Sequence, residues 1–226
     1  MIPSVPASPG APLPCGPTTL LVIAKEPVPG RVKTRLTPPF SAEEAAELAA
    51  ASLSDTLLTV LCLPAVRRVL VLEGGPGPWL PPGIEVVPQC SGGLDERIAA
   101  AFAGCDGPAL LIGMDTPQVA PVHLAPALAP DGWERCDAWF GEAEDGGFWA
   151  LGLASPDPGL LRGVPMSVPG TGAVQRARLL DAGLTVRELP RLRDVDTAED
   201  AVRVAGLAPH GRFAATLDRL NRAAAR

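Results

Sequence analysis

The sequence predicts an α/β protein built on a mostly parallel central sheet. Short apolar runs with the length and composition of buried strands recur between residues 20 and 189, and amphipathic helical patterns separate most of them. Such alternation is typical of βαβ units, which form a parallel sheet covered by helices. The alternation breaks between residues 138 and 153, where two strand-like runs follow each other, so we expect a small antiparallel excursion there.

The expected strands are short runs of apolar residues between turn signals. The first begins at Leu20 and ends in a loop punctuated by proline and glycine. The others cover residues 66–72, 84–87, 109–112, 138–140, 148–153 and 185–189.

The expected helices have identifiable start signals. Ser41 can cap the first helix, and Glu44 can return a bond to the backbone N–H of Ser41, which predicts a capping box. This helix runs towards residue 61. The remaining helices are expected at 94–104, at 121–128, at about 172–182, from a second capping-box pattern at 197–200, and from about 209 to 226.

Composition narrows the class of protein. The 226 residues are 47% hydrophobic and 19% charged, as expected for a globular protein. A net charge of −6 argues against a nucleic-acid binder but allows a local basic pocket for one nucleotide. No apolar run approaches the roughly 18 residues of a membrane helix. Widely spaced cysteines without a CxxC pair fit a reduced, cytoplasmic protein.

We expect two parts along the chain. Residues 1–17 contain six prolines and no charged side chain, which predicts a disordered, polyproline-like arm rather than a signal peptide. Residues 18–226 show no internal linker or repeat and are expected to form one domain.

The loop that follows the first strand is rich in cations. It carries Lys25, Arg31, Lys33 and Arg35, with Gly30 among them. Ligands of open α/β sheets bind beyond the carboxyl ends of the strands, where this loop must lie. Cations and exposed backbone N–H groups suit a polyphosphate. The alternative is a solvated basic loop without a ligand.

Acidic residues follow two other strands. Asp115 comes just after the run at 109–112, where a carboxylate could hold Mg²⁺ together with substrate phosphates. The alternative is an ordinary Asx-turn. Asp194 and Asp196 point the same way if the chain is extended, and could supply a second metal ligand. The alternative is favourable electrostatics at the start of the following helix.

Two glycine pairs lie beside possible ligand sites. Gly146 and Gly147 follow Asp145 and would let the backbone approach a ligand, while Asp145 could bind acceptor hydroxyls or act as a base. The alternative is a polar hairpin turn. Gly92 and Gly93 precede a predicted helix, and helix N-termini favour anions.

Taken together, five segments resemble a known family. They are AKEPVPGRVKTRL, QCSGGLDERIAAAF, LIGMDTPQVAP, GEAEDGGFWALGL and DVDTAEDA. They resemble the DUF2064 family, also called rSAM/selenodomain-associated transferase 1 or arsenosugar-biosynthesis glycosyltransferase-like. This family belongs to the GT-A-like nucleotide-diphospho-sugar transferase superfamily. The resemblance implies a Rossmann-type α/β/α sandwich that binds a nucleotide and a divalent metal, Mg²⁺ or Mn²⁺.

The resemblance also implies roles for individual residues. Phosphate binding would fall to Gly30, Lys33 and Arg35, and metal binding to Asp115 with Asp196 or Asp194. The acceptor side would be lined by Asp145, Gly146 and Gly147. The chain departs from the family at residues 164–167, VPMS, where a Trp-Ser-Thr segment is usual, and this leaves the acceptor open.

Three functions remain open from the sequence. In nucleotidyl transfer, a small phosphorylated or phosphonylated acceptor attacks an NTP and releases pyrophosphate; the density of cations in one loop favours this. In glycosyl transfer from an NDP-sugar, Asp145 or Glu144 would be the base, but residues 113–115, GMD, lack the first acid of a DxD pair. The third possibility is a non-catalytic nucleotide-binding protein.

Overall fold

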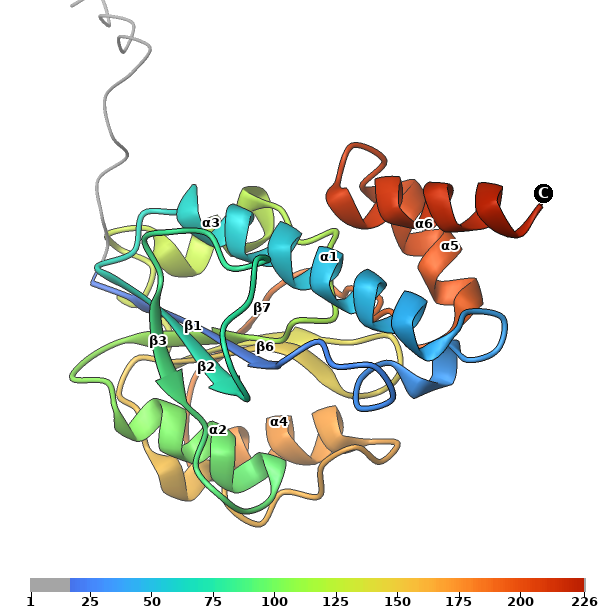
Figure 1. The fold of residues 1–226 in the computed structure, drawn as a ribbon. Helices are drawn as coiled ribbons and strands as arrows, with labels where there is room; N and C mark the ends of the chain where they lie inside the picture. The colour runs from blue at the N-terminus through green and yellow to red at the C-terminus, as the bar shows by residue number, and fades with distance from the viewer. Residues whose placement is uncertain (1–16, 226) are drawn as a thin grey trace, which may run out of the picture.

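The computed structural model describes residues 17–225 and contains a seven-stranded sheet in the order β3-β2-β1-β4-β6-β5-β7 (Figure 1). Strand β6 runs antiparallel to both of its neighbours, and the other pairs are parallel. The predicted α/β class, parallel sheet and antiparallel excursion are confirmed. The strands are β1 (Thr19–Lys25), β2 (Arg67–Glu73), β3 (Glu85–Pro88), β4 (Ala109–Ile112), β5 (Ala138–Glu142), β6 (Phe148–Leu153) and β7 (Val186–Glu188).

Helices cover both faces of the sheet. Side chains alternate along β1, so Leu20 and Val22 pack on one face and Leu21 on the other. The first face is covered by α1 and α3 and the second by α2 and α4, which makes an α/β/α sandwich (Figure 1). The helices are α1 (Ala42–Leu61), α2 (Leu94–Ala103), α3 (Pro121–Leu128), α4 (Thr171–Asp181), α5 (Ala198–Leu207) and α6 (Arg212–Ala224).

Both predicted capping boxes form. At α1 the backbone N–H of Glu44 donates to the Ser41 hydroxyl at 3.2 Å, and the N–H of Ser41 donates to the Glu44 carboxylate at 2.8 Å. At α5, Thr197 and Asp200 exchange the same two bonds at 3.2 and 3.0 Å. These local signals explain why the starts of both helices could be predicted from sequence.

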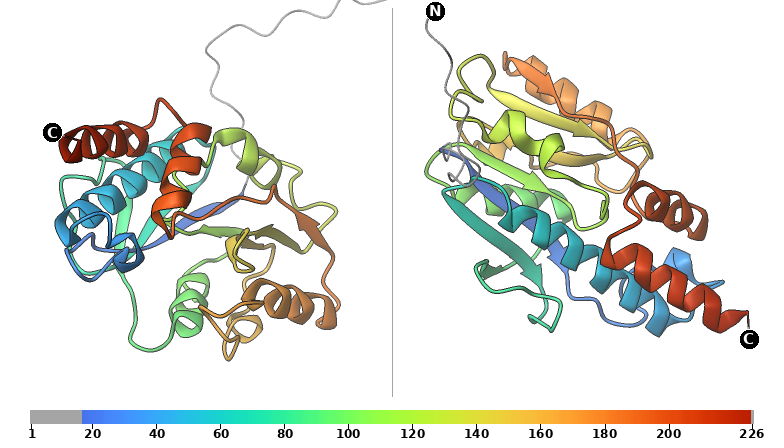
Figure 2. Two further views of the ribbon diagram at one scale, coloured as in Figure 1. Left: turned by 90° about the vertical axis from the view of Figure 1, so that its right-hand side faces the viewer. Right: turned by 90° about the horizontal axis from the view of Figure 1, so that it is seen from above.

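The last helix begins later than the expected residue 209. Helix α6 starts at Arg212, because the Asp55 carboxylate of α1 accepts the N–H groups of Arg212 and Phe213 at 3.0 and 2.9 Å. Figure 2 shows α6 lying along α1, with α5 beside it. Leu36 and Phe40, from the segment after β1, are buried in the same cluster as these helices. The C-terminal helices therefore brace the cation-rich segment.

The carboxyl ends of β1, β4, β5 and β7 share one edge, because these strands are parallel to one another. The segments that follow them, which carry the predicted site residues, meet at that edge. None of the helices between residues 17 and 225 combines the length and the apolar character of a membrane span. The predicted arm at residues 1–17 lies, except for Pro17, outside the described residues.

Candidate functional site

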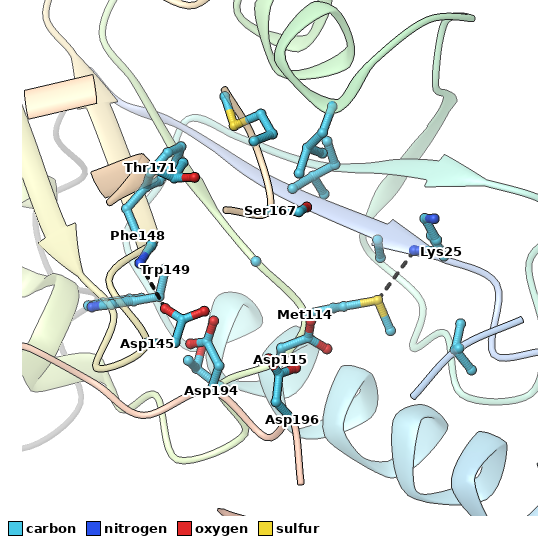
Figure 3. A pocket seen from close by; sticks show the side chains of 18 of the residues that line it. Lys25, Met114, Asp115, Asp145, Phe148, Trp149, Ser167, Thr171, Asp194 and Asp196 are labelled. Atoms are coloured by element: carbon cyan, nitrogen blue, oxygen red, sulfur yellow. Dashed lines mark hydrogen bonds between the residues drawn. The ribbon is translucent and has the colours of Figure 1, made fainter. Parts of the chain in front are cut away.

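A cavity of about 600 Å³ opens at this edge of the sheet (Figure 3). Pockets that enclose small ligands span roughly 300–1,000 Å³, so its size suits a nucleotide-sized ligand. Eight of the predicted site residues line it: Lys25, Lys33, Arg35, Asp115, Asp145, Gly147, Asp194 and Asp196. Lys25 is the last residue of β1, and the others come from the segments that follow β1, β4, β5 and β7, as the parallel topology requires.

Lys33 lies at the centre of the charged groups. Its ammonium Nζ is 2.8 Å from Asp115 Oδ1 and 3.5 Å from Asp196 Oδ1, and it also donates to the carbonyl oxygen of Val195. The Lys33 side chain is only 8% exposed. Burial opposes its charge, but the carboxylates of Asp115, Asp196 and Asp194 outweigh that effect and raise the pKa of Lys33. The ammonium is therefore a permanent cation in this cluster.

Local backbone structure holds Lys33 in place. It adopts the left-handed conformation, with φ of 50°, and starts a short 3₁₀ helix, Thr34–Leu36, whose Leu36 is fully buried. The two acidic segments are tied together, since the N–H of Val195 donates to the carbonyl of Asp115 at 2.9 Å. A non-glycine residue in the left-handed region costs on the order of 1 kcal/mol. This strain is typical of functional sites.

Asp194 is the most perturbed acid of the cluster. Its Oδ1 is buried and has no hydrogen-bond partner among the described residues. Burial raises the pKa of this carboxyl to about 7, and the nearby charges of Asp115 and Asp145 add to the effect. A buried carboxylate oxygen without a partner, beside other acids, suits a cation that would neutralise the group. We name Asp115, Asp145, Asp194 and Asp196 the acidic cluster (Figure 3).

Asp145 lies in the turn between β5 and β6. Its Oδ1 accepts the N–H of Gly147 at 2.8 Å, and the N–H of Gly146 donates to the carbonyl of Ala143 at 3.1 Å. The N–H of Gly172, at the start of α4, donates to the carbonyl of Gly146 at 2.9 Å. The segment is therefore a hairpin turn, as the alternative interpretation held, and this turn also lines the cavity.

A second charged group surrounds Glu73 at the end of β2. Its carboxylate lies 3.7 Å from Lys25 and 3.7 Å from Arg31, and Arg97 donates to it. Burial would raise the pKa of Glu73, but Arg97, Lys25 and Arg31 together lower it. Two of the loop cations therefore share a protein counter-ion, which leaves Lys33 and Arg35 as the pair nearest the acidic cluster.

Four predicted ligand-binding glycines do not line the cavity: Gly30, Gly92, Gly93 and Gly146. The start of α2 carries its own acid, because the N–H of Gly93 donates to Glu96 at 2.8 Å. The carbonyl of Gly92 accepts from Arg97 at 2.9 Å. An anion at this helix start would compete with Glu96, so phosphate binding there stays a prediction.

Sequence reasoning missed three features of the site. The Val195 carbonyl could not be singled out, because any residue supplies one. Glu73 was detectable as an acid at the carboxyl end of a strand, the same signal that marked Asp115. The apolar side chains of the cavity, among them Phe148 and Met166, carried no signal of their own, because apolar residues are expected in every core.

Comparison with known proteins places this fold. The family model described as "Uncharacterized protein conserved in bacteria (DUF2064)" matches residues 47–168, which is more than half of the chain. The chain belongs to the DUF2064 family. The matched DUF2064 region includes the middle three of the five segments that predicted the resemblance, while the segments around Lys33 and Asp196 lie outside it. No curated protein matches the sequence.

Solved structures share the fold. A protein from Desulfovibrio desulfuricans G20, described as a candidate nucleotide-diphospho-sugar transferase, is 26% identical with a TM-score of 0.81, over 92% of this chain and 96% of that chain. CMP:2-keto-3-deoxy-manno-octonic acid synthetase complexed with CTP is 9% identical with a TM-score of 0.53, over 86% of this chain and 99% of that chain. The inositol-1-phosphate CTP transferase from T. maritima is 12% identical with a TM-score of 0.51, over 85% of this chain and 96% of that chain. The DUF2064 chain thus has a GT-A-like fold, and the likeness to the Desulfovibrio desulfuricans protein supports transferase chemistry.

Proposed function

We propose that this DUF2064 protein transfers a nucleotidyl group from an NTP to a small phosphorylated or phosphonylated acceptor and releases pyrophosphate. One observation carries the proposal: Lys33, Arg35 and the acidic cluster meet in one cavity at the carboxyl edge of the sheet. This juxtaposes cations suited to phosphates with acids suited to a divalent cation. Of the two more distant structures that share the fold, one is described as a synthetase complexed with CTP and the other as a CTP transferase.

The residues present fit a divalent cation. Asp115 and Asp196 would hold Mg²⁺ or Mn²⁺, with Asp194 as the third candidate because its buried Oδ1 has no partner among the described residues. No three His, Cys, Asp or Glu side chains of residues 17–225 form a ready metal cage. Mg²⁺ does not require one, since it is commonly held by one or two carboxylates and substrate phosphates. When bound, the ion would neutralise charge on the reacting phosphates.

The chain's own residues would position the substrates and neutralise charge. Arg35, whose side chain is 73% exposed, would bind the β- and γ-phosphates and the departing pyrophosphate. Lys33 would exchange its present carboxylate partners for phosphate oxygens. An acceptor oxygen forms a bond to the α-phosphorus while the bond to the bridging oxygen of the β-phosphate breaks, and pyrophosphate leaves with that electron pair. A dianionic acceptor has no proton to lose, so this step needs no general base.

Glycosyl transfer from an NDP-sugar is the second candidate. The relative from Desulfovibrio desulfuricans favours it, since its description names a nucleotide-diphospho-sugar transferase. In this case Asp145 would take the proton of an acceptor hydroxyl, because it lines the cavity together with the other three acids of the acidic cluster. Glu144 is the weaker base, since Arg193 already donates to its carboxylate.

The products distinguish the two reactions. Phosphorus NMR of a mixture of the protein, Mg²⁺, an NTP and a pool of small phosphates is expected to show pyrophosphate and a new signal from a substituted diphosphate. Asp115→Asn should abolish both signals. Release of a nucleoside diphosphate from an NDP-sugar, without turnover of any NTP, would replace our proposal with glycosyl transfer. Absence of both activities would favour a binding protein.

A further inference from the structure

One part of the cavity lining consists of apolar side chains. They come from β1, α2, β6 and the segment before α4, and we name them the apolar wall: Ile23, Leu94, Ile98, Phe148, Met166 and Val168. Leu94 and Val168 are 40% and 48% exposed, which is unusual for side chains of their size beside a core. Apolar surface left open inside a ligand cavity is available for a ligand to cover.

The segment that contributes Met166 and Val168 is anchored at both ends. The Thr171 hydroxyl lies 2.8 Å from the carbonyl oxygens of both Pro165 and Val168. At the other end, the N–H of Gly163 donates to the Asp95 carboxylate of α2 at 2.7 Å. The apolar wall is therefore a built part of the cavity and not the side of a loose loop.

The same hydrogen bonds limit what the wall can recognise. The Thr171 hydroxyl is engaged by Pro165 and Val168, and it also accepts the N–H of Val168 at 3.3 Å. In residues 163–171 this leaves Ser167 as the other hydroxyl lining the cavity. A sugar-like molecule needs several polar partners, and each unpaired hydroxyl would lose its bond to water on binding.

We propose that the acceptor carries an apolar body of several carbons, which lies against the apolar wall. Its reacting group then reaches the acidic cluster, of which Asp145 is a member and which borders the same cavity. Asp145 and Phe148 are separated by only the glycine pair, so the polar and apolar parts of the acceptor side adjoin. This inference rests on the proposed function, because it names the acceptor class for that transfer.

A series of n-alkyl phosphates tests the inference. Calorimetric titration of ethyl to hexyl phosphate into the protein with Mg²⁺ is expected to lower Kd about twofold to fourfold per added CH₂. Propyl phosphate should bind more tightly than glycerol 3-phosphate, which has the same chain length and two hydroxyls. A Kd independent of chain length, or tighter binding of glycerol 3-phosphate, would overturn the inference.

Two valine variants localise the effect. Val168→Asp places a charge on the apolar wall and is expected to remove most of the dependence on chain length. Val202→Asp makes the same change on α5, at a valine that is 61% exposed and outside the cavity. This variant should show the same dependence of Kd on chain length as the wild type. Both sites are exposed, and melting temperatures verify that both variants fold. An unchanged series in Val168→Asp would contradict the placement.

The melting-temperature shift caused by NTPs separates this inference from the proposed function. A shift with an NTP, together with a Kd for alkyl phosphates that does not depend on chain length, would refute the apolar acceptor but not nucleotidyl transfer. A Kd that falls with chain length, without a shift from any NTP, would support the apolar acceptor site and refute nucleotidyl transfer.

Discussion

Asp194 combines burial, negative neighbours and a missing partner, and each of these destabilises its charged form. Its pKa of about 7 lies above the ordinary value of 3.8. At a pH between these two pKa values, Asp194 holds a proton in the folded protein and releases it in the unfolded chain. Stability from this group is therefore complete below about pH 4 and is lost as the pH rises through 7.

Asp194→Asn should remove this pH dependence, because an amide does not titrate. With metal chelated, we expect the variant to gain stability over the wild type between pH 5 and pH 8, by a few kcal/mol at most. Urea unfolding at the two pH values measures the gain. Asp181→Asn, at an exposed aspartate that does not line the cavity, is the control. Equal pH dependence in wild type and Asp194→Asn would contradict the assignment.

Lys33 supplies a built-in cation to two of the acids that we assign to the metal. Lys33→Met is expected to cost about 2 kcal/mol without metal, less than a fully buried pair, since the side chains of Asp115 and Asp196 are 39% and 34% exposed. Mn²⁺ should then stabilise this variant more than the wild type. Thermal unfolding with and without Mn²⁺ measures both effects.

Arg35→Met is the matched comparison. The Arg35 side chain is 73% exposed and pairs with Asp196 at 3.1 Å, so its loss should cost less than about 1 kcal/mol. Both variants should weaken binding of an NTP. Equal losses of stability in the two, with no added effect of Mn²⁺ in Lys33→Met, would mean that Lys33 does not substitute for a metal.

The sequence predicted the convergence of Lys33, Asp115 and Asp196, because residues after parallel strands must meet at one edge. It could not predict that Lys33 would be paired with both acids, since that depends on side-chain conformation. Glu96 shows the same limit. Its backbone position follows from the helix pattern, but its bond to the N–H of Gly93 appears only in the structure.

The junction of α4 with the β5–β6 turn is tightly packed. A Cβ added to Gly172 would lie 2.3 Å from the carbonyl oxygen of Gly147, which is too close for any contact. Gly172→Ala should therefore displace the turn that carries Asp145, cost about 1–3 kcal/mol and weaken acceptor binding. Urea unfolding and calorimetry with propyl phosphate measure the two effects.

Gly206 of α5 is the control for this substitution. Apart from its chain neighbours and the backbone of its own helix, no atom lies within 4 Å of a Cβ built there. Gly206→Ala should leave binding unchanged and stabilise the protein by up to about 1 kcal/mol, because alanine favours the helix. If Gly172→Ala leaves stability and the binding of propyl phosphate as little changed as Gly206→Ala does, the turn is not constrained by α4.

Elements with local signals were predicted well. The strand at 109–112 and the helix at 121–128 match β4 and α3, and the capping patterns located the starts of α1 and α5. The start of α6 was missed because it depends on Asp55, which lies 157 residues away in the chain. Contacts of this range leave no pattern in the sequence near the helix itself.

The whole chain is acidic, with a formal charge of −6, yet the first loop concentrates cations. The fold reconciles the two facts by pairing those cations with Glu73 and with the acidic cluster. The positive and negative side chains of the site therefore nearly offset each other. A free anion would meet the acids there, and a free cation would meet the basic side chains. A metal–nucleotide complex brings both charges at once and fits this balance.

The most direct test of the account is the melting temperature with Mg²⁺ and each nucleotide. A ligand that binds only the folded protein at about 100 times its Kd adds about 2.7 kcal/mol. For a chain of this size we therefore expect one NTP to raise the melting temperature by about 5 °C or more, and Asp115→Asn to lose the shift. A larger shift with an NDP-sugar than with its parent NTP, or no shift with any nucleotide, would contradict the account.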